Sequence, residues 1–560
     1  MKIIDNLILS TDNNEKQDTF NLTILVIVTL TCLVPFLNKA FHIDDPLFLW
    51  AARHIQSSPF DFYGFKVNWY GHEMPMFEVM QNPPLVPYYI AIVASLFGWA
   101  EVTLHIAFLV PAIAFVIGTY YLAKVFCSTP LVATLVSIST PVFLVSSTSV
   151  MCDTMMLSFW VWATFTWIQG IKNNSNINLI CAAFLIALCS LTKYYGISLI
   201  PLLFIYSLVY KRKLGQWALF LLIPVLILLT YQWLAYALYG RGLILDAASY
   251  ALSYPKAPQF IVKGLEGLLF TGGCFISVLF YSLLLFRART ISILASSILL
   301  FFLYYILSQR PTEFQFIFDD KLNWLFTIES CLFTMAGVVI LLIAALDLWR
   351  RRDADSLLLF LCITGAFIFA SFINWNVAGR SVLPMAPVIG VLVFRHIEQK
   401  KPVIHYSIIK KTSLILLVPS FLIALSLSWT DYIWANTNRS EAIEMRQQYA
   451  HDSGTLWFQG HWGFQYYMEA NGGKAMDYEK TKVNVGDIVV IPSEHDIISP
   501  LNKNLYTLIK IHHVPLVSWI STWSGSIGAG FYSSIIGPLP FVVGPVPDID
   551  YFVFLKKSHL

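Results

Sequence analysis

Two adjacent carboxylates, Asp44 and Asp45, follow the first long apolar run of the chain and open a polar loop. Asp45 stands directly before Pro46, a pattern typical of a helix start, so the sequence is equally compatible with a capping role and a catalytic role for Asp45. Asp44 has no capping duty in that arrangement. A carboxylate at this place can accept a proton from an incoming hydroxyl group. The pair therefore predicts acid–base chemistry, with Asp44 as the base.

Three cations are expected at the same ends of the helices as these carboxylates, namely Lys193, Arg310 and Arg380. A single long cationic side chain at a helix end can reach lipid headgroups without any bound ligand. Several cations around a carboxylate instead indicate a site for an anionic group. The sequence therefore predicts an anion site beside Asp44, with headgroup contact as the alternative for each cation.

Further polar candidates are expected near the same surface. Asn82 belongs to a stretch with two prolines, and Asp153 stands at the mouth of an apolar run, where capping and a functional role are equally compatible with the sequence. His72 and Glu73 lie in the same loop as Asp44. These four residues complete the set of candidate site residues, and none of the set is assigned as a metal ligand.

The elements that position these residues are apolar helices. Of the 560 residues, 57% are hydrophobic and 12% are charged, and the mean hydropathy is +0.66. A soluble globular protein carries about 25% charged residues. Apolar runs of roughly 20 residues, the length that crosses a bilayer as a helix, follow one another from residue 20 to residue 429. About 13 spans are expected, at 20–37, 102–124, 129–147, 150–170, 177–192, 195–210, 215–238, 265–286, 290–307, 324–346, 355–373, 381–396 and 410–429.

Lysines and arginines recur in every second loop between these spans, and loops of that kind lie in the cytoplasm. The first polar loop, 38–83, and the tail, 430–560, then face outward. One short apolar run at 84–98 breaks the alternation and opens with two prolines, so a helix lying at the outer interface is expected there. The net charge of +3 is small, and no basic stripe indicates a nucleic-acid partner.

The composition changes abruptly after residue 429. Apolar runs shorten to strand length at 487–492, 517–520 and 551–555, and a helix is expected at 462–470, ending at a pair of glycines. About 130 residues are enough for a small α/β domain. None of the eight cysteines follows residue 430, so no disulfide framework is expected in the tail. The predicted fold is a polytopic α-helical membrane protein, with a transmembrane domain at 1–429 and a soluble extracytoplasmic α/β domain at 430–560.

The order of these features resembles the GT-C superfamily of membrane glycosyltransferases, in particular the protein O-mannosyltransferases and the lipid A aminoarabinose transferases. The resemblance spans nearly the whole chain, and the tail stretch 460–468 also resembles the outer domain of bacterial relatives. The acidic pair of the family is usually Asp-Glu, whereas here it is Asp-Asp, a departure that concerns the second position. The residues that carry the resemblance are Asp44, Asp45, Asn82, Asp153, Lys193 and Arg380.

The resemblance implies transfer of a sugar, with inversion, from a polyprenyl-phosphate donor to an acceptor hydroxyl on the outer face of the membrane. It implies Asp44 as the base, and Lys193, Arg380 and Arg310 as the residues that bind the donor phosphate. The partners are then a lipid-linked sugar and a protein, lipid or glycan acceptor, in a bacterial inner membrane. No cofactor is implied, and a divalent metal, which some members of the superfamily use, stays open.

This interpretation agrees with elementary chemistry. A polyprenyl phosphate leaves without a strong acid, whereas the acceptor hydroxyl needs a base, and nearby cations stabilise the charge that grows on the departing phosphate. One alternative is a secondary transporter, which needs polar groups near the bilayer midplane, where this sequence has almost none. A second alternative is a polymerase or ligase that moves whole lipid-linked glycans, which the same outward site could serve.

Overall fold

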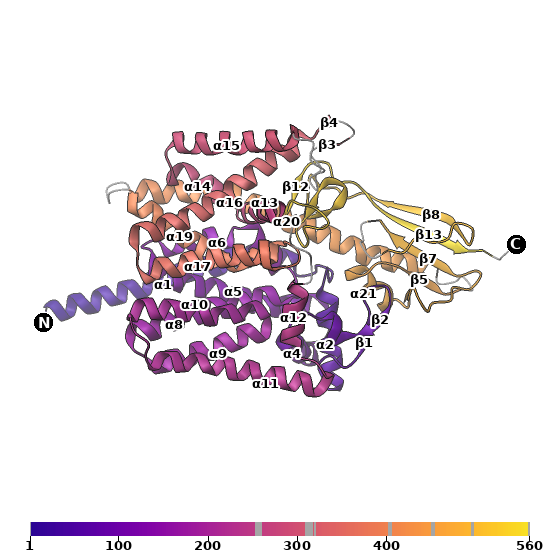
Figure 1. Cartoon of the computed structure of the whole chain (residues 1–560), viewed down its shortest axis with the longest axis horizontal. Coiled ribbons are helices and arrows are strands. Elements are labelled where there is room, and N and C mark those ends of the chain that lie inside the picture. Colours follow the sequence, from indigo (N-terminus) through magenta and orange to yellow (C-terminus); the bar gives the residue numbers. More distant parts are fainter. Residues whose placement is uncertain are drawn as a thin grey trace.

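A bundle of long helices forms most of the molecule, and a small strand-containing domain built by the end of the chain sits at one end of the bundle (Figure 1). The computed structural model describes residues 2–252, 260–307, 317–318, 321–400, 406–449, 454–493 and 498–557, with side chains at 15–252, 260–304, 323–399, 411–449, 454–493 and 498–557. The first helix, α1 (Lys2–Leu33), runs into this bundle from the end opposite the strand-containing domain.

Eight helical segments of the described residues are long and apolar enough to cross a membrane. Two further pairs of helices meet the same requirement together, although each is bent at a short break: α6 (Pro130–Ile138) with α7 (Pro141–Ser147) by 65°, and α13 (Phe260–Cys274) with α14 (Ser277–Leu285) by 88°. The eight segments are Glu15–Phe36, Glu101–Phe126, Tyr194–Lys211, Gln216–Tyr239, Trp324–Arg351, Ala354–Ile373, Gly379–Gln399 and Lys411–Tyr449.

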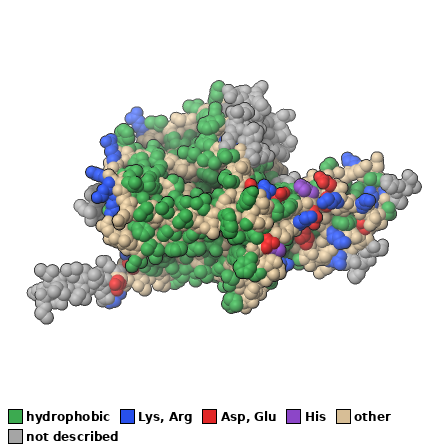
Figure 2. All heavy atoms as spheres, turned by 60° about the horizontal axis from the view of Figure 1, so that its bottom comes forward, with side chains coloured by type: hydrophobic (Ala, Val, Ile, Leu, Met, Phe, Trp, Pro, Cys, Tyr) green, Lys and Arg blue, Asp and Glu red, His purple; other side chains and the backbone are tan. Residues whose placement is uncertain are grey.

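The three remaining predicted ranges also fall on helices, namely α8 (Cys152–Asn173), α9 (Asn176–Thr192) and α15 (Ala288–Leu307). Every predicted span therefore lies on a helix, although only eight to ten described segments qualify as spans by length and composition. Figure 2 shows a broad hydrophobic surface along the flank of the bundle, as a surface that faces lipid requires. The predicted polytopic helical fold with a C-terminal strand-containing domain is confirmed.

The loop after the first span is itself structured. It contains α2 (Asp45–Ser57), a hairpin of β1 (Lys66–Asn68) and β2 (Glu73–Pro75), and one turn of helix, α3 (Met76–Val79). The short apolar run that follows forms α4 (Leu85–Phe97), which is only 13 residues long and packs against α2. The short helix predicted there is therefore present, and it packs between the loop and the helical bundle.

The tail begins inside a helix, because α20 (Tyr406–Tyr449) continues without a break past residue 430. A five-stranded sheet follows, in the order β6-β5-β7-β13-β8. The expected helix is present as α21 (Trp462–Ala470), and it connects the parallel strands β5 and β6. The strands are β5 (Leu456–Phe458), β6 (Lys474–Ala475), β7 (Ile488–Pro492), β8 (Tyr506–Val514) and β13 (Ile549–Lys556).

Two of the three strands predicted in the tail are confirmed as β7 and β13, which pair with each other. The strand predicted at 517–520 is wrong, since only its last residue belongs to a strand, β9 (Ile520–Ser521), which pairs with β12 (Val542–Val543). Val517 and Trp519 are 86% and 73% exposed, so most of this apolar segment lies on the surface outside the sheets.

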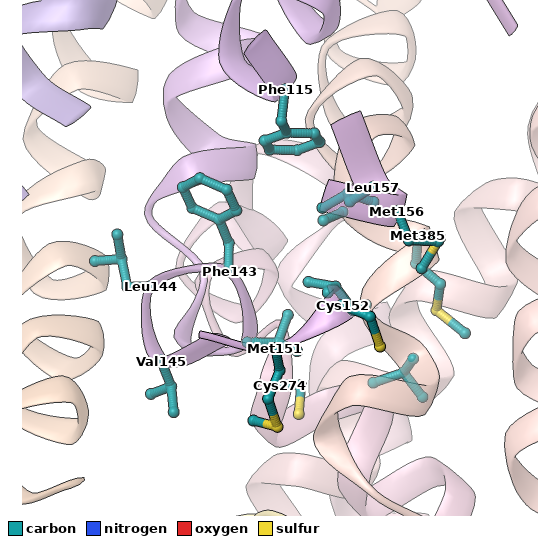
Figure 3. Packing of buried hydrophobic residues seen from close by; sticks show 14 of the residues in the cluster. Phe115, Phe143, Leu144, Val145, Met151, Cys152, Met156, Leu157, Cys274 and Met385 are labelled. Atoms are coloured by element: carbon teal, nitrogen blue, oxygen red, sulfur yellow. The ribbon is translucent and has the colours of Figure 1, made fainter. Parts of the chain in front are cut away.

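The core beneath the junction of bundle and tail is rich in sulfur and aromatic side chains. Figure 3 shows Phe115 and Phe143 facing each other above Met151, Cys152 and Cys274, and their ring centroids are 4.8 Å apart. Flexible thioether side chains fill irregular gaps well. This packing fixes the segment between α7 and α8, which lies directly under the candidate site.

Candidate active site

A cavity of about 460 Å³ lies at the junction of the helical bundle and the tail. Its volume falls within the roughly 300–1,000 Å³ typical of small-molecule sites. Asp44, Asn82, Lys193 and Arg380, which are widely separated in sequence, all line this one cavity. The structure therefore brings together four of the nine predicted site residues.

Asp44 occupies the N-cap position of α2, yet its side chain makes no capping hydrogen bond. Its Oδ2 instead accepts a hydrogen bond from Nη1 of Arg380 at 2.5 Å, and the two side chains remain 23% and 28% exposed. Arg380 lies in α18 (Gly379–Val382), one turn of helix that follows the π-helical end of the preceding span, Phe369–Ile373. A carboxylate and a guanidinium thus face the cavity as an ion pair.

Asp45 is placed differently from its neighbour, because its side chain is fully buried and is absent from the cavity lining. Its Oδ2 accepts from the backbone N–H of His42 at 2.8 Å, and its Oδ1 accepts from the backbone N–H of Val150 at 2.9 Å. Burial raises the pKa of Asp45 to about 7, although these two hydrogen bonds act in the opposite direction. The capping alternative for Asp45 is not observed, since the carboxylate joins its own loop to the segment before α8.

A second ion pair stands at the cavity. Nζ of Lys193 lies 2.5 Å from Oδ1 of Asp153, and Asp153 is buried in the first turn of α8. The N-cap of α8 is Met151 and makes no side-chain capping bond, so the capping alternative for Asp153 is not observed. Lys193 ends α9, and the backbone turns there into a short 3-10 helix, Tyr194–Ser198. Asp153 therefore acts by holding Lys193, which itself faces the cavity.

The other candidates divide into those at the cavity and those away from it. Asn82 lines the cavity, and its Oδ1 accepts a long hydrogen bond from Sγ of Cys152 at 3.5 Å. His72 and Glu73 are exposed on the hairpin, and the structure does not bring them to the cavity lining. Glu73 lies 3.7 Å from Lys66 on the facing strand. Arg310 lies outside the described residues.

Sequence reasoning missed the aromatic lining of the cavity. The rings come from the first loop, from the bundle and from the tail, and aromatics form 15% of the chain, so no local signal distinguished these from the rest. The aromatic residues that line the cavity include Trp69, Tyr70, Tyr194, Tyr195, Tyr250, Trp375, Trp462, Trp523 and Tyr532.

A buried ion pair beside the cavity was also missed. Nζ of Lys39 lies 2.6 Å from Oδ2 of Asp431, and neither side chain has any exposed surface. Thr522 and Tyr532 of the tail donate hydrogen bonds to the same carboxylate, at 3.0 and 2.8 Å. Lys39 follows the first span and Asp431 follows the last predicted one, so charges at the ends of apolar runs were the available signal. This cluster joins the first loop, α20 and the tail.

Among the described residues, no group of three or more His, Cys, Asp and Glu side chains is arranged to hold a metal ion. The charged groups that line the cavity are Asp44, Lys193 and Arg380. The site can therefore bind an anionic group through two cations and can offer one carboxylate to a proton.

Residues 81–236 match the family model of dolichyl-phosphate-mannose-protein mannosyltransferases. The matched stretch contains Asn82, Asp153 and Lys193, and it ends well before Arg380. Over these residues, the resemblance to the protein O-mannosyltransferases of the GT-C superfamily that was predicted from the sequence is confirmed. None of the curated proteins matches this chain.

Solved structures of similar shape include an archaeal and a bacterial enzyme. The oligosaccharyltransferase of Archaeoglobus fulgidus in the apo form has a TM-score of 0.48 and 15% identity over 82% of this chain, and the chain spans 64% of its length. The archaeal oligosaccharyltransferase AglB from Archaeoglobus fulgidus, in complex with an inhibitory peptide and a dolichol-phosphate, has a TM-score of 0.47 and 13% identity over 83% of this chain and 64% of its own. ArnT from Cupriavidus metallidurans bound to undecaprenyl phosphate has a TM-score of 0.40 and 13% identity, covering 84% of this chain and 92% of that enzyme.

Proposed function

We propose that this protein is a membrane glycosyltransferase that moves a sugar from a polyprenyl-phosphate donor to an acceptor hydroxyl with inversion. The observation that carries the proposal is the presence of Asp44, Lys193 and Arg380 in one cavity between the helical bundle and the tail. The family match over residues 81–236 supports the same class of reaction. The bundle offers an apolar surface to the lipid part of the donor, and the cavity offers polar groups to its sugar and phosphate.

The ion pair between Asp44 and Arg380 supports separate roles for these two side chains in the reaction. A guanidinium has five N–H donors, so Arg380 can bind a phosphate while it still holds the Asp44 carboxylate. The acceptor oxygen attacks the anomeric carbon and passes its proton to Asp44. The bond from that carbon to the phosphate oxygen breaks, and the phosphate leaves with the electron pair. Arg380 and Lys193 stabilise the charge that develops on the phosphate.

The distribution of charge supports an outward position for the cavity and the tail. Figure 2 shows Lys and Arg side chains gathered at the end of the bundle opposite the tail. Arg351 and Lys172 lie in the last turns of their helices and pair with Asp347 and Asp355. Since basic ends of spans face the cytoplasm, the tail and the cavity would face outward, across a bacterial inner membrane.

The proposal is tested with the full-length protein in lipid nanodiscs and a series of polyprenyl-phosphate-linked sugars. Release of free polyprenyl phosphate is measured by mass spectrometry in the presence of a membrane and envelope extract as the acceptor source. We expect release from at least one donor, and loss of that release in Asp44→Asn. If undecaprenyl phosphate does not bind and no donor is consumed, the protein is not a transferase of this class.

A further inference from the structure

One side of the cavity is a continuous row of aromatic rings contributed by the tail and the first loop. We call it the aromatic wall and define it by Trp69, His461, Trp462, Trp523 and Tyr532, all of which line the cavity. The ring centroids are 4.9 Å apart from Trp69 to His461 and 4.2 Å from His461 to Trp462. The row continues at 4.8 Å to Trp523 and 6.4 Å to Tyr532. Ring contacts thus run unbroken along this side.

The backbone at the centre of the aromatic wall adopts a conformation that a tryptophan rarely takes. Trp462 has φ +61°, in the left-handed region, at the point where α21 begins. Bulky residues persist there only where the surroundings fix them, and such residues cluster at ligand sites. Gly463 supplies the constraint, since a Cβ at this position would lie 2.2 Å from the carbonyl oxygen of Phe41. The turn that orients Trp462 therefore packs against the loop that leads to Asp44.

None of the residues that define the aromatic wall is a lysine, an arginine, an aspartate or a glutamate. The two cations belong to the helical bundle, and each faces a carboxylate: Lys193 faces Asp153, and Arg380 faces Asp44. Beside the wall the lining offers amide and hydroxyl groups, including Asn376, whose Nδ2 donates to Oγ of Ser533 at 2.8 Å. An acceptor carrying phosphate groups would find no additional lysine or arginine among the described lining residues.

Flat rings combined with amides and hydroxyls suit one class of molecule. The C–H face of a pyranose ring packs on an aromatic ring, while its hydroxyl groups exchange hydrogen bonds with amide and hydroxyl side chains. We propose that the aromatic wall is the acceptor site and that the acceptor is an uncharged saccharide. This inference rests on the proposed function, since it assigns the second substrate of the same cavity.

The two sides of the cavity separate the two substrates. Lys193, Tyr194 and Phe369 come from the bundle, through which a lipid-linked donor reaches Asp44. The aromatic wall comes from the tail and the first loop, and we assign it to the water-soluble acceptor. A saccharide hydroxyl held on the wall attacks the anomeric carbon, its proton passes to Asp44, and the phosphate leaves with the electron pair.

Saturation-transfer NMR on the full-length protein in nanodiscs loaded with undecaprenyl phosphate tests the acceptor class. The probes are three neutral disaccharides (cellobiose, maltose and mannobiose), a peptide rich in serine and threonine, and monophosphoryl lipid A. We expect signals from at least one disaccharide and none from the peptide or the phosphorylated glycolipid. Binding of either of those two without any disaccharide, or no binding at all, overturns the proposal.

Trp462→Gly is the sharpest variant, because glycine accepts the left-handed backbone and removes only the ring. We expect disaccharide binding to weaken at least tenfold in Trp462→Gly and to persist in Trp462→Phe. The control is Trp519→Ala, which removes an exposed tail tryptophan that does not line the cavity and should leave binding unchanged. Unchanged disaccharide binding in Trp462→Gly contradicts the assignment.

Undecaprenyl phosphate binding, followed by native mass spectrometry on the same samples, separates this inference from the proposed function. If the parent binds undecaprenyl phosphate but no disaccharide, only the acceptor site is refuted. If the parent fails to bind undecaprenyl phosphate as well, the proposed function is refuted together with the acceptor site.

Discussion

The two neighbouring carboxylates of the first loop have opposite surroundings. Asp44 faces the cavity and Arg380, whereas Asp45 is buried between the backbone N–H groups of His42 and Val150. The sequence pattern before Pro46 could not separate them, because side-chain direction at a helix start depends on the segment that packs against it. That segment, near Val150, is more than 100 residues away in the chain.

Asp45 should make the stability of the protein depend on pH. Its folded-state pKa of about 7 lies above the ordinary value of 3.8, so the folded state holds a proton that the unfolded state has released. The stabilising contribution is therefore complete below about pH 4 and is lost as the pH rises through 7. Asp45→Asn does not titrate, and we expect its thermal midpoint to fall less between pH 4 and pH 8 than that of the parent. Equal slopes in parent and variant would refute this role of Asp45.

Arg380 should be sensitive even to a substitution that keeps its charge. Lysine preserves the charge but loses the planar fork that can hold a carboxylate and a phosphate together. We expect Arg380→Lys and Arg380→Ala each to weaken undecaprenyl phosphate binding roughly 10- to 100-fold, the range for a charge-assisted hydrogen bond. Native mass spectrometry and transfer kinetics measure both effects. Lys211→Ala, at the end of α10 (Leu199–Lys211), is the control. If neither Arg380 variant affects donor binding, Arg380 contacts lipid headgroups and does not bind the donor phosphate.

Elements that cross the membrane were predictable, whereas the elements that complete the site were not. A span needs roughly 20 apolar residues whatever packs around it, so each predicted range lies on a helix. α21 was also predictable, because a helical pattern ends there at Gly472, whose φ is +84°. The aromatic wall could not be predicted, since its rings come from residues 69, 461–462, 523 and 532, which only the tertiary fold brings together. Strands of two or three residues could not be predicted either, because so short a segment shows too little sequence pattern.

The join between the first loop, α20 and the tail depends on the buried pair Lys39 and Asp431. Removing one partner leaves an uncompensated buried charge, which costs about 3–5 kcal/mol. We expect Asp431→Leu to lower the free energy of unfolding by that amount, and Lys39→Met with Asp431→Leu together to lower it by less than the sum of the single changes. Thermal unfolding in detergent across the four proteins of this double-mutant cycle measures the coupling. Strictly additive effects would contradict a direct pair.

In the whole molecule, the tail and the cavity must share the outward side if sugar transfer takes place there. A membrane-impermeant maleimide added to intact cells should label Asn471→Cys, in the tail, and should fail to label Arg351→Cys, at the other end of α16 (Trp324–Arg351). Permeabilised cells provide the control, since both positions should then react. A tail that is labelled only after permeabilisation would put the cavity on the cytoplasmic face.

Asp44→Asn tests whether Asp44 is the base of a sugar transfer. Asparagine keeps nearly the same shape, and its Oδ1 can still accept a hydrogen bond from Arg380, but it cannot take the acceptor proton. We predict that transfer falls by about 10²- to 10⁴-fold, the usual contribution of a general base, while undecaprenyl phosphate binding stays within a few-fold of the parent. Asp548→Asn, an exposed carboxylate of the tail, should leave both unchanged. Turnover near that of the parent in Asp44→Asn would show that Asp44 is not the base.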